Sequence, residues 1–156
     1  MRLGILAVGH KAPDWVIQGC AEYIRRMPRE LPLAIVEIRP EARGAKNRAQ
    51  LLAAEKARLL AALNGYQRMI VLDERGVDLP TRQLAERLAA WMRAGGATAF
   101  VIGGADGVDE SLKQQADETI RLSSLTLPHA IARLILCEQL YRAISIVRQH
   151  PYHREG

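Results

Sequence analysis

The sequence predicts a single α/β domain over residues 1–156, built on a mostly parallel sheet with helices on both faces. A chain of 156 residues is long enough for one such domain and its core. Short apolar runs alternate with longer segments of helical period, which is the pattern of strands followed by helices. Residues 69–72 (Met-Ile-Val-Leu) show no polar alternation, and this indicates a strand covered on both faces, as in a parallel sheet.

The first three elements follow from apolar runs and charge placement. Residues 3–8 and 33–38 are short, apolar and β-like, so we expect the first two strands there. Residues 13–27 lie between them and predict a helix. Asp14 in its first turn and Arg25 and Arg26 in its last turn suit the helix dipole.

A basic segment separates the second strand from the second helix. Residues 39–48 contain three arginines and a lysine against one glutamate, and Pro40 and Gly44 interrupt regular structure there, so we expect a loop. The second helix is predicted over residues 46–63. Asn64 and Gly65 close it, because both residue types tolerate the left-handed conformation at a helix end.

The remaining elements alternate in the same way. The third strand is expected at residues 69–72, and Thr81 is the expected cap of a third helix that Gly95 and Gly96 end. A fourth strand follows at residues 98–102. The last segments are a turn at 103–107, a short helix at 110–117, an extended piece at 119–122, a long helix at 130–148 and a tail at 150–154.

The long final helix has apolar residues on more than one side. One stripe contains Leu136, Leu140, Ile144 and Val147, and other faces contain Ile131, Ile135 and Tyr141. A helix of this kind needs burial on several sides. In so small a chain, one side can pack on the sheet and another on a symmetry mate, so we expect a twofold homodimer.

Composition restricts the class of protein. The longest stretch without a charged residue, residues 94–105, is shorter than the about 20 apolar residues of a membrane span, so we expect no membrane contact and a cytoplasmic location. Cys20 and Cys137 have no second thiol at metal or redox spacing, and we expect both to be buried and reduced. The net charge of +5, carried mostly by arginine, favours a polyanionic partner, although a GC-rich genome explains the arginines equally well.

Common catalytic signatures are absent from the sequence. It has no phosphate loop of the Walker type, no G-x-S-x-G nucleophile elbow and no H-E-x-x-H zinc helix. The usual dinucleotide fingerprint is also missing after the first strand. His150 and His153 have the spacing of half a metal site, but no cysteine or carboxylate cluster completes it, so we expect no metal.

Two segments remain as candidate ligand sites. The turn at 103–107 directly follows a buried strand, where ligands bind in parallel α/β sheets. Its glycines permit close approach either of a ligand or of a neighbouring loop. The segment 123–129 alternates hydroxyls with leucines, which suits an adenine ring, but on its own this pattern favours a buried connection satisfied by its own serines.

The tail adds a third candidate. It combines Tyr152, His153 and Arg154, side chains that stack, form hydrogen bonds and bind phosphate. These groups suit an unstacked base and its backbone. The alternative is a tail that only packs on a partner subunit.

Several motifs together resemble the RlmH family, the pseudouridine-N3 methyltransferases of large-subunit ribosomal RNA within the SPOUT superfamily. The resemblance spans nearly the whole chain, and its motifs agree in order and spacing. One departure is Ala105-Asp106, where relatives carry proline and glutamate. The matching motifs are Ala7-Val8-Gly9, Pro13-Asp14-Trp15, Glu22-Tyr23, Ile70-Val71-Leu72-Asp73, Ile102-Gly103-Gly104, Leu122 to His129 (LSSLTLPH), Glu138 to Ala143 (EQLYRA) and Pro151-Tyr152-His153-Arg154.

The resemblance implies a deep C-terminal trefoil knot, a homodimer and S-adenosyl-L-methionine as the methyl donor. It assigns the cofactor pocket to Leu72, Gly103, Gly104, Leu122, Ser123, Ser124, Leu125, Thr126 and Leu127. It assigns the methyl-transfer site to His129, Tyr152, His153 and Arg154, completed across the dimer. We expect RNA contacts from Arg43, Lys46, Arg48 and Arg142.

The implied reaction is one in-line displacement that needs no metal, in which the protein aligns the base, excludes water and helps to remove the N3 proton. The positive charge of Arg154 would favour the nucleobase without its N3 proton, and His129, His153 or water would accept that proton. Ribosomal RNA or the assembled ribosome would be the substrate.

Two alternative functions come from other classes of protein: a noncatalytic RNA-binding or ribosome-binding protein, and a nucleotide-binding α/β oxidoreductase.

Overall fold

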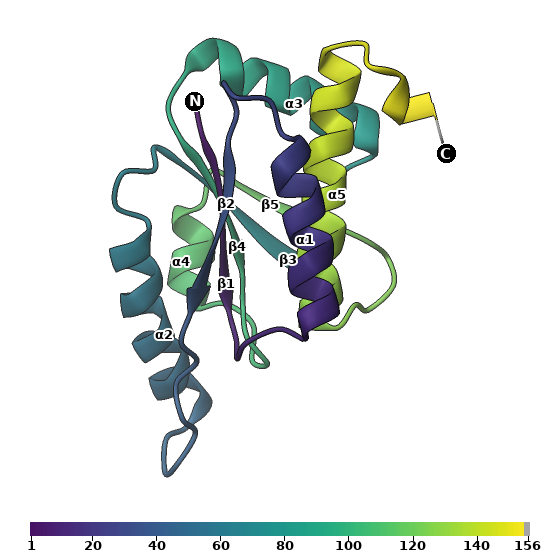
Figure 1. The fold of residues 1–156 in the computed structure, drawn as a ribbon. Helices are drawn as coiled ribbons and strands as arrows, with labels where there is room; N and C mark the ends of the chain where they lie inside the picture. The colour runs from purple at the N-terminus through teal and green to yellow at the C-terminus, as the bar shows by residue number, and fades with distance from the viewer. Residues whose placement is uncertain (155–156) are drawn as a thin grey trace.

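The computed structural model describes residues 1–154 as a five-stranded sheet between two layers of helices (Figure 1). The strand order is β2-β1-β4-β3-β5, and all four neighbouring pairs are parallel. This confirms the predicted α/β class with a parallel sheet. The strands are β1 (Leu3–Val8), β2 (Leu33–Ile38), β3 (Arg68–Asp78), β4 (Thr98–Ile102) and β5 (Glu118–Arg121).

The helices divide between the two faces of the sheet. One face is covered by α1, α3 and α5, and the other by α2 and α4 (Figure 1). A short 3-10 helix, η1, follows α5. The bounds are α1 (Asp14–Arg26), α2 (Arg48–Ala62), α3 (Thr81–Ala94), α4 (Glu110–Gln115), α5 (His129–Val147) and η1 (Pro151–Arg154).

Burial of both sheet faces explains the unbroken apolar runs. In β1, Ile5 and Ala7 belong to the core under α1, α3 and α5, while Leu6 and Val8 belong to the core under α2 and α4. Successive side chains of a strand point to opposite faces, so a strand covered on both sides is apolar at every position. All six residues of β1 are buried.

Three strands, β1, β2 and β4, have the predicted bounds, but β3 is longer than expected. The prediction ended at Leu72, whereas β3 continues to Asp78. The extension contains Glu74, Arg75 and Asp78, so it lacks the apolar signal of a strand. It pairs with β5 after a register shift, and Gly76 makes this possible: a Cβ there would lie 2.5 Å from the carbonyl carbon of Ile120.

Two expected helix starts were wrong. Helix α2 begins at Arg48 rather than residue 46, because the Asn47 side chain accepts the Gln50 N–H and the Gln50 side chain accepts the Asn47 N–H. Thr81 does not cap α3. It is the first residue of that helix, and its hydroxyl donates to Gln139 Oε1 at 2.7 Å, which ties α3 to α5. The remaining helix ends and β5 differ from prediction by one or two residues.

Helix α5 satisfies much of its apolar surface within its own chain. It packs between α1 and α3, and Leu136, Leu140 and Ile144 are fully buried there. Leu140 and Ile144 therefore do not face a partner, so this stripe is the side of the helix that packs within its own chain. Ile131 and Ile135, on another side of the helix, stay half-buried. The homodimer and the trefoil knot remain predictions.

The fold brings the two cysteines together. Cys20 of α1 and Cys137 of α5 are both buried and free, as predicted, and their side chains form a hydrogen bond. This contact lowers the pKa of Cys20 and, with burial, raises the pKa of Cys137. The pair was not predictable from the sequence, because more than a hundred residues separate the two cysteines.

None of the helices among residues 1–154 is long and apolar enough to cross a membrane.

Candidate active site

An open cleft of about 1190 Å³ lies at the carboxyl ends of the central strands. Its floor includes Val8 at the end of β1, Leu72 of β3 and Ile102 at the end of β4. This edge of a parallel sheet is the usual ligand site, because loops and exposed backbone amides converge there. The loops around residues 9–10, 40–48, 103–108 and 121–129 form the walls.

Eight of the nine residues expected at the cofactor pocket line this cleft. Ser124 does not, and its side chain is exposed to solvent. Leu125 is 73% exposed, which is unusual for a leucine, and it lies on the cleft wall. The eight lining residues are Leu72, Gly103, Gly104, Leu122, Ser123, Leu125, Thr126 and Leu127.

Gly103 and Gly104 of the turn have different surroundings, so glycine is required to a different degree at the two positions. A Cβ on Gly103 would lie 2.5 Å from the Gly107 backbone, so this glycine permits the turn to close on itself. The Gly107 N–H donates to the Gly104 carbonyl at 3.0 Å and completes that closure. A Cβ on Gly104 would lie 3.2 Å from Val8 and 3.8 Å from Glu55 Oε1. Closure of the turn on itself, rather than a neighbouring loop, accounts for Gly103.

His129 lies at the first turn of α5 with its imidazole against the backbone of Gly9. A Cβ on Gly9 would be 2.9 Å from His129 Cε1, so a glycine is needed to seat the ring. The Nε2 atom is buried and has no hydrogen-bond partner among the described residues. Burial, together with the nearby positive charge of Arg133, lowers the pKa of His129. The imidazole is therefore neutral at physiological pH.

Arg133, one turn further along α5, is 2% exposed. Its Nη1 forms an ion pair with Glu37 of β2 at 3.2 Å. The Nε and Nη2 atoms are buried without partners within residues 1–154. This guanidinium places a fixed positive charge behind His129.

The basic loop reaches the cleft through an acidic residue of the glycine turn. Arg43 forms an ion pair with Asp106 at 2.5 Å, and Arg48 Nη2 donates to the Asp106 carbonyl at 2.8 Å. Both arginines line the cleft, whereas exposed Lys46 does not. Asp106, where the sequence departs from its family resemblance, thus links the loop to the turn.

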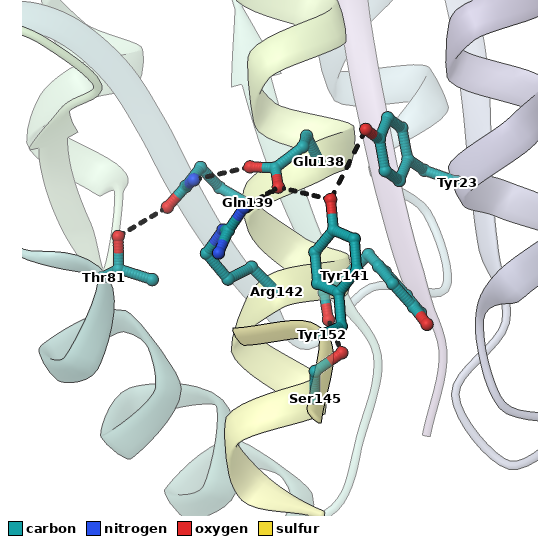
Figure 2. Close-up of polar contacts among 8 residues, drawn as sticks. All are labelled: Tyr23, Thr81, Glu138, Gln139, Tyr141, Arg142, Ser145 and Tyr152. Carbon is teal, nitrogen blue, oxygen red and sulfur yellow. Dashed lines mark hydrogen bonds and ion pairs between the residues drawn. The ribbon is translucent and has the colours of Figure 1, made fainter. Parts of the chain in front are cut away.

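The tail folds back along the second half of α5, where Tyr152 contacts Glu138 and Tyr141. Figure 2 shows the Tyr152 hydroxyl between Tyr23 and Glu138. It donates to Glu138 Oε2 at 2.7 Å, and Arg142 Nε donates to the same oxygen at 3.1 Å. The Tyr152 ring packs edge-on against Tyr141, with ring centroids 4.6 Å apart. Burial and the hydrogen bonds with Tyr23 and Glu138 raise the pKa of Tyr152.

One protomer does not bring the four expected methyl-transfer residues together. Helix α5 has 19 residues, and Tyr152 contacts Glu138, which lies nine residues after His129, about 13.5 Å along the helix at about 1.5 Å per residue. His129 stands at its first residue, beside the cleft, and Tyr152, His153 and Arg154 follow its far end. Arg142 belongs to the tail cluster, so the four expected RNA contacts also divide between two places.

Sequence reasoning missed several residues of the cleft. Gly9 was identified as the end of the first strand but not as the seat of His129. Glu55 was missed altogether, although it interrupts an apolar helix stripe between Leu51 and Leu59, and that interruption is a signal visible in the sequence. Asp73 also lines the cleft, with its carboxylate 2.5 Å from Lys113 Nζ.

Comparison with known proteins identifies the family. The family model described as "Predicted SPOUT methyltransferase" matches residues 1–153. The chain belongs to this family. A protein of Dechloromonas aromatica named "Ribosomal RNA large subunit methyltransferase H" is 63% identical over 156 residues, covering all of both chains. A protein of Ralstonia pickettii with the same name is 56% identical over 155 residues, covering 99% of both chains.

Solved structures share the SPOUT methyltransferase fold at low identity. A probable methylase family protein from Haemophilus influenzae has a TM-score of 0.57 and 16% identity, covering 97% of this chain and 69% of that chain. A putative methylase family protein from Neisseria gonorrhoeae has a TM-score of 0.54 and 16% identity, covering 90% and 80%. These likenesses concern the fold alone.

A SPOUT methyltransferase needs a methyl donor, and the cleft suits an amphipathic one. It offers apolar side chains from the 122–127 segment beside backbone groups of the glycine turn, the usual composition of a small-molecule site. Family membership favours methyl transfer over the oxidoreductase and noncatalytic alternatives. Within residues 1–154, no group of three or more metal-ligating side chains is assembled.

Proposed function

We propose that this chain is a homodimeric, cytoplasmic S-adenosyl-L-methionine-dependent methyltransferase that methylates N3 of a pseudouridine in large-subunit ribosomal RNA. The observation that carries the proposal is identity of 52–63% over the full chain to proteins named as large-subunit ribosomal RNA methyltransferases. The open cleft at the carboxyl ends of the strands, lined by eight of the nine expected cofactor residues, supports it independently.

The donor would lie in the cleft with its adenine among the leucines of the 122–127 segment, near Leu72 and the glycine turn. Leu125 supports this placement, because an exposed leucine on a cleft wall gains burial when an apolar ring covers it. S-adenosyl-L-methionine supplies a methyl group already activated on a sulfonium. The protein therefore mainly has to orient the base, exclude water and manage one proton.

His129 is the side chain best placed to receive the N3 proton. It adjoins the cleft, its ring is seated by Gly9, and its lowered pKa keeps it neutral and able to accept a proton. A histidine of lowered pKa is a weak proton acceptor. A nearby cation is therefore needed as well, to favour the nucleobase that has lost its N3 proton. Arg154 would supply that charge, and His153 is the alternative acceptor.

The tail and the cleft would meet across a dimer. Their separation along α5 supports this arrangement, because Tyr152, His153 and Arg154 cannot reach the cleft of their own chain without leaving the cluster around Glu138. In a twofold dimer, each tail serves the cleft of the partner. The base would then bind between one protomer's cleft and the other's tail.

The RNA backbone would bind the basic loop and the tail arginines. Lys46 is exposed, and Arg43 and Arg48 stand at the cleft rim, so phosphates could approach all three beside a bound donor. Arg142, beside Tyr152, would extend the positive surface on the partner's side. The net charge of +5 has the sign that such a partner requires.

Methyl transfer from labelled donor onto RNA tests the proposal. Ribosomes, isolated large subunits and naked ribosomal RNA should be prepared from cells that lack this activity, and the labelled nucleoside identified by mass. We expect one methyl group on N3 of a pseudouridine in large-subunit RNA. RNA binding without methyl transfer would support the noncatalytic alternative, and tighter binding of a dinucleotide than of S-adenosyl-L-methionine would support the oxidoreductase.

A further inference from the structure

Glu55 of α2 is a buried acidic side chain in the wall of the cleft. It is 5% exposed. Among the described residues, Glu55 and Arg133 are the two charged residues that are buried. Leu51 and Leu59, one turn before and after it, are buried on the same side of α2. An apolar side chain at position 55 would continue this stripe, so packing alone does not account for a carboxylate.

The two oxygens of Glu55 have different surroundings. Oε2 accepts the backbone N–H of Glu41 at 3.0 Å and so fastens the start of the basic loop to α2. Oε1 is directed to the glycine turn, 3.8 Å from the position of a Cβ on Gly104. Within residues 1–154, no hydrogen bond or ion pair ends on Oε1.

Among the other carboxylates around the cleft, Glu74 is exposed to water, and the rest form ion pairs with cations. Asp106 pairs with Arg43, and Asp73 pairs with Lys113. Burial opposes the charged form of Asp73, but the hydrogen bonds from Lys113 and from the Arg75 N–H hold its pKa below the usual value. Glu55 differs from both, because none of the ion pairs of the described chain includes it.

A largely buried carboxylate without a cation costs free energy, because the one hydrogen bond from Glu41 replaces only part of the hydration that the charge has lost. Fastening the loop does not require that charge, since the amide oxygen of glutamine accepts an N–H equally well. The charge of Glu55 is therefore explained best by a cation that enters the cleft with a ligand.

We propose that Glu55 binds the positive charge of the methyl donor. This inference rests on the proposed function, because S-adenosyl-L-methionine carries two cationic groups, the sulfonium and the α-ammonium. In the low-dielectric wall of the cleft, either group would interact with a carboxylate more strongly than in water. Glu55 thereby orients the methionine end of the donor, while the 122–127 segment holds the adenine.

Calorimetric binding of three ligands to wild type and to Glu55→Gln tests the inference. Glutamine keeps the size of the side chain and the acceptor for the Glu41 N–H, and removes only the charge. S-adenosyl-L-methionine has both cationic groups, S-adenosylhomocysteine keeps the ammonium alone, and methylthioadenosine has neither. We expect Glu55→Gln to weaken S-adenosyl-L-methionine binding about 10- to 100-fold and to leave methylthioadenosine binding unchanged.

The homocysteine ligand tells which cationic group Glu55 holds. Weakening of both charged ligands assigns Glu55 to the ammonium, and weakening of S-adenosyl-L-methionine alone assigns it to the sulfonium. Equal effects on all three ligands, or none, would overturn the inference. Glu86→Gln, which removes an exposed carboxylate from α3, is the matched control and should bind all three ligands as wild type does.

Two further measurements separate this inference from its alternatives. The melting temperature of Glu55→Gln should equal or exceed that of wild type, because the variant removes an unpaired buried charge. Glu55→Asp keeps the charge and should retain most of the preference for S-adenosyl-L-methionine over methylthioadenosine. Failure of wild type to bind any of the three ligands would instead contradict the proposed function.

Discussion

The imidazole of His129 rests on the backbone of Gly9, so closely that a Cβ on Gly9 would lie 2.9 Å from Cε1 of the ring. The contact joins the end of β1 to the start of α5, two segments 120 residues apart. It determines where the neutral histidine stands relative to the cleft.

Gly9→Ala should therefore displace the His129 ring and slow methyl transfer. Displacements of about 1 Å at a reacting group can cost about 100-fold in rate, and we expect a loss of at least about tenfold in the single-turnover rate. The matched control is a double-mutant cycle. In a His129→Ala background the Gly9→Ala change should have no further effect, and a further loss of similar size would mean that Gly9 acts independently of the histidine.

The lowered pKa of His129 predicts a pH dependence of stability. As pH falls below about 6.5, the unfolded chain takes up the histidine proton before the folded chain does. Protonation then favours unfolding, so this residue contributes stability above that pH and loses it as pH decreases. Urea unfolding at pH 7.5 and 5.5 should show a smaller difference in unfolding free energy for His129→Gln than for wild type. An identical difference would contradict the burial of a neutral ring.

Changes in the tail should separate methyl transfer from donor binding. Tyr152→Phe, Arg154→Ala and truncation after residue 150 leave the cleft intact, so donor affinity should remain at the wild-type value. The single-turnover rate should fall strongly, because these groups act on the base rather than on the donor. Full activity of the truncated protein would show that the tail serves only in packing. His129 would then be the main candidate for the catalytic residue.

Mixed dimers should show whether tail and cleft come from different protomers. A His129→Ala protein and a truncated protein, each strongly impaired alone, should regain activity when they are denatured and refolded together. Random assembly should restore roughly a quarter of the complete clefts, because half of the dimers are mixed and each mixed dimer has one. Refolding either variant alone is the control, and activity that stays absent in the mixture would argue for a site within one protomer.

Two residues of the basic loop should respond differently to loss of charge. The Lys46 side chain forms no hydrogen bond or ion pair within the described residues, so Lys46→Gln should lower the salt slope of ribosome binding by about one and leave donor binding unchanged. Arg43→Gln also breaks the ion pair with Asp106 and should weaken donor binding through the glycine turn. Equal donor affinities for the two variants would show that the ion pair between Arg43 and Asp106 does not stabilise the donor site.

Leu125 should contribute to ligand affinity but little to folding. Its side chain is already exposed, so Leu125→Ser should leave the unfolding free energy close to that of wild type. If adenine covers this leucine, donor affinity should fall about tenfold. Leu60→Ser, at another exposed leucine outside the cleft, is the control. Calorimetry that gives equal affinities for both variants would place the adenine elsewhere.

The pattern of apolar residues was enough to predict the fold class and most of its elements. Strands covered on both faces must be apolar at every position, so β1 and β4 were identifiable with their bounds. The cleft was largely predictable for a related reason. Ligand sites of parallel sheets lie directly after the strands, so the glycine turn at 103–107 could be selected as a candidate from its position. The 122–127 segment was a candidate because of its residue pattern, and the family resemblance assigned both to the cofactor pocket.

Tertiary structure decided which distant residues meet. Local patterns indicate that a residue is buried but not what it contacts, so the pairing of Gly9 with His129 and of Glu55 with the glycine turn was not predictable. The polar half of β3 was missed because its pairing with β5, rather than its own composition, makes it a strand. The tail is separated from the cleft of its own chain because Tyr152 binds Glu138, nine residues along α5 from His129, and a list of site residues contains no such distance.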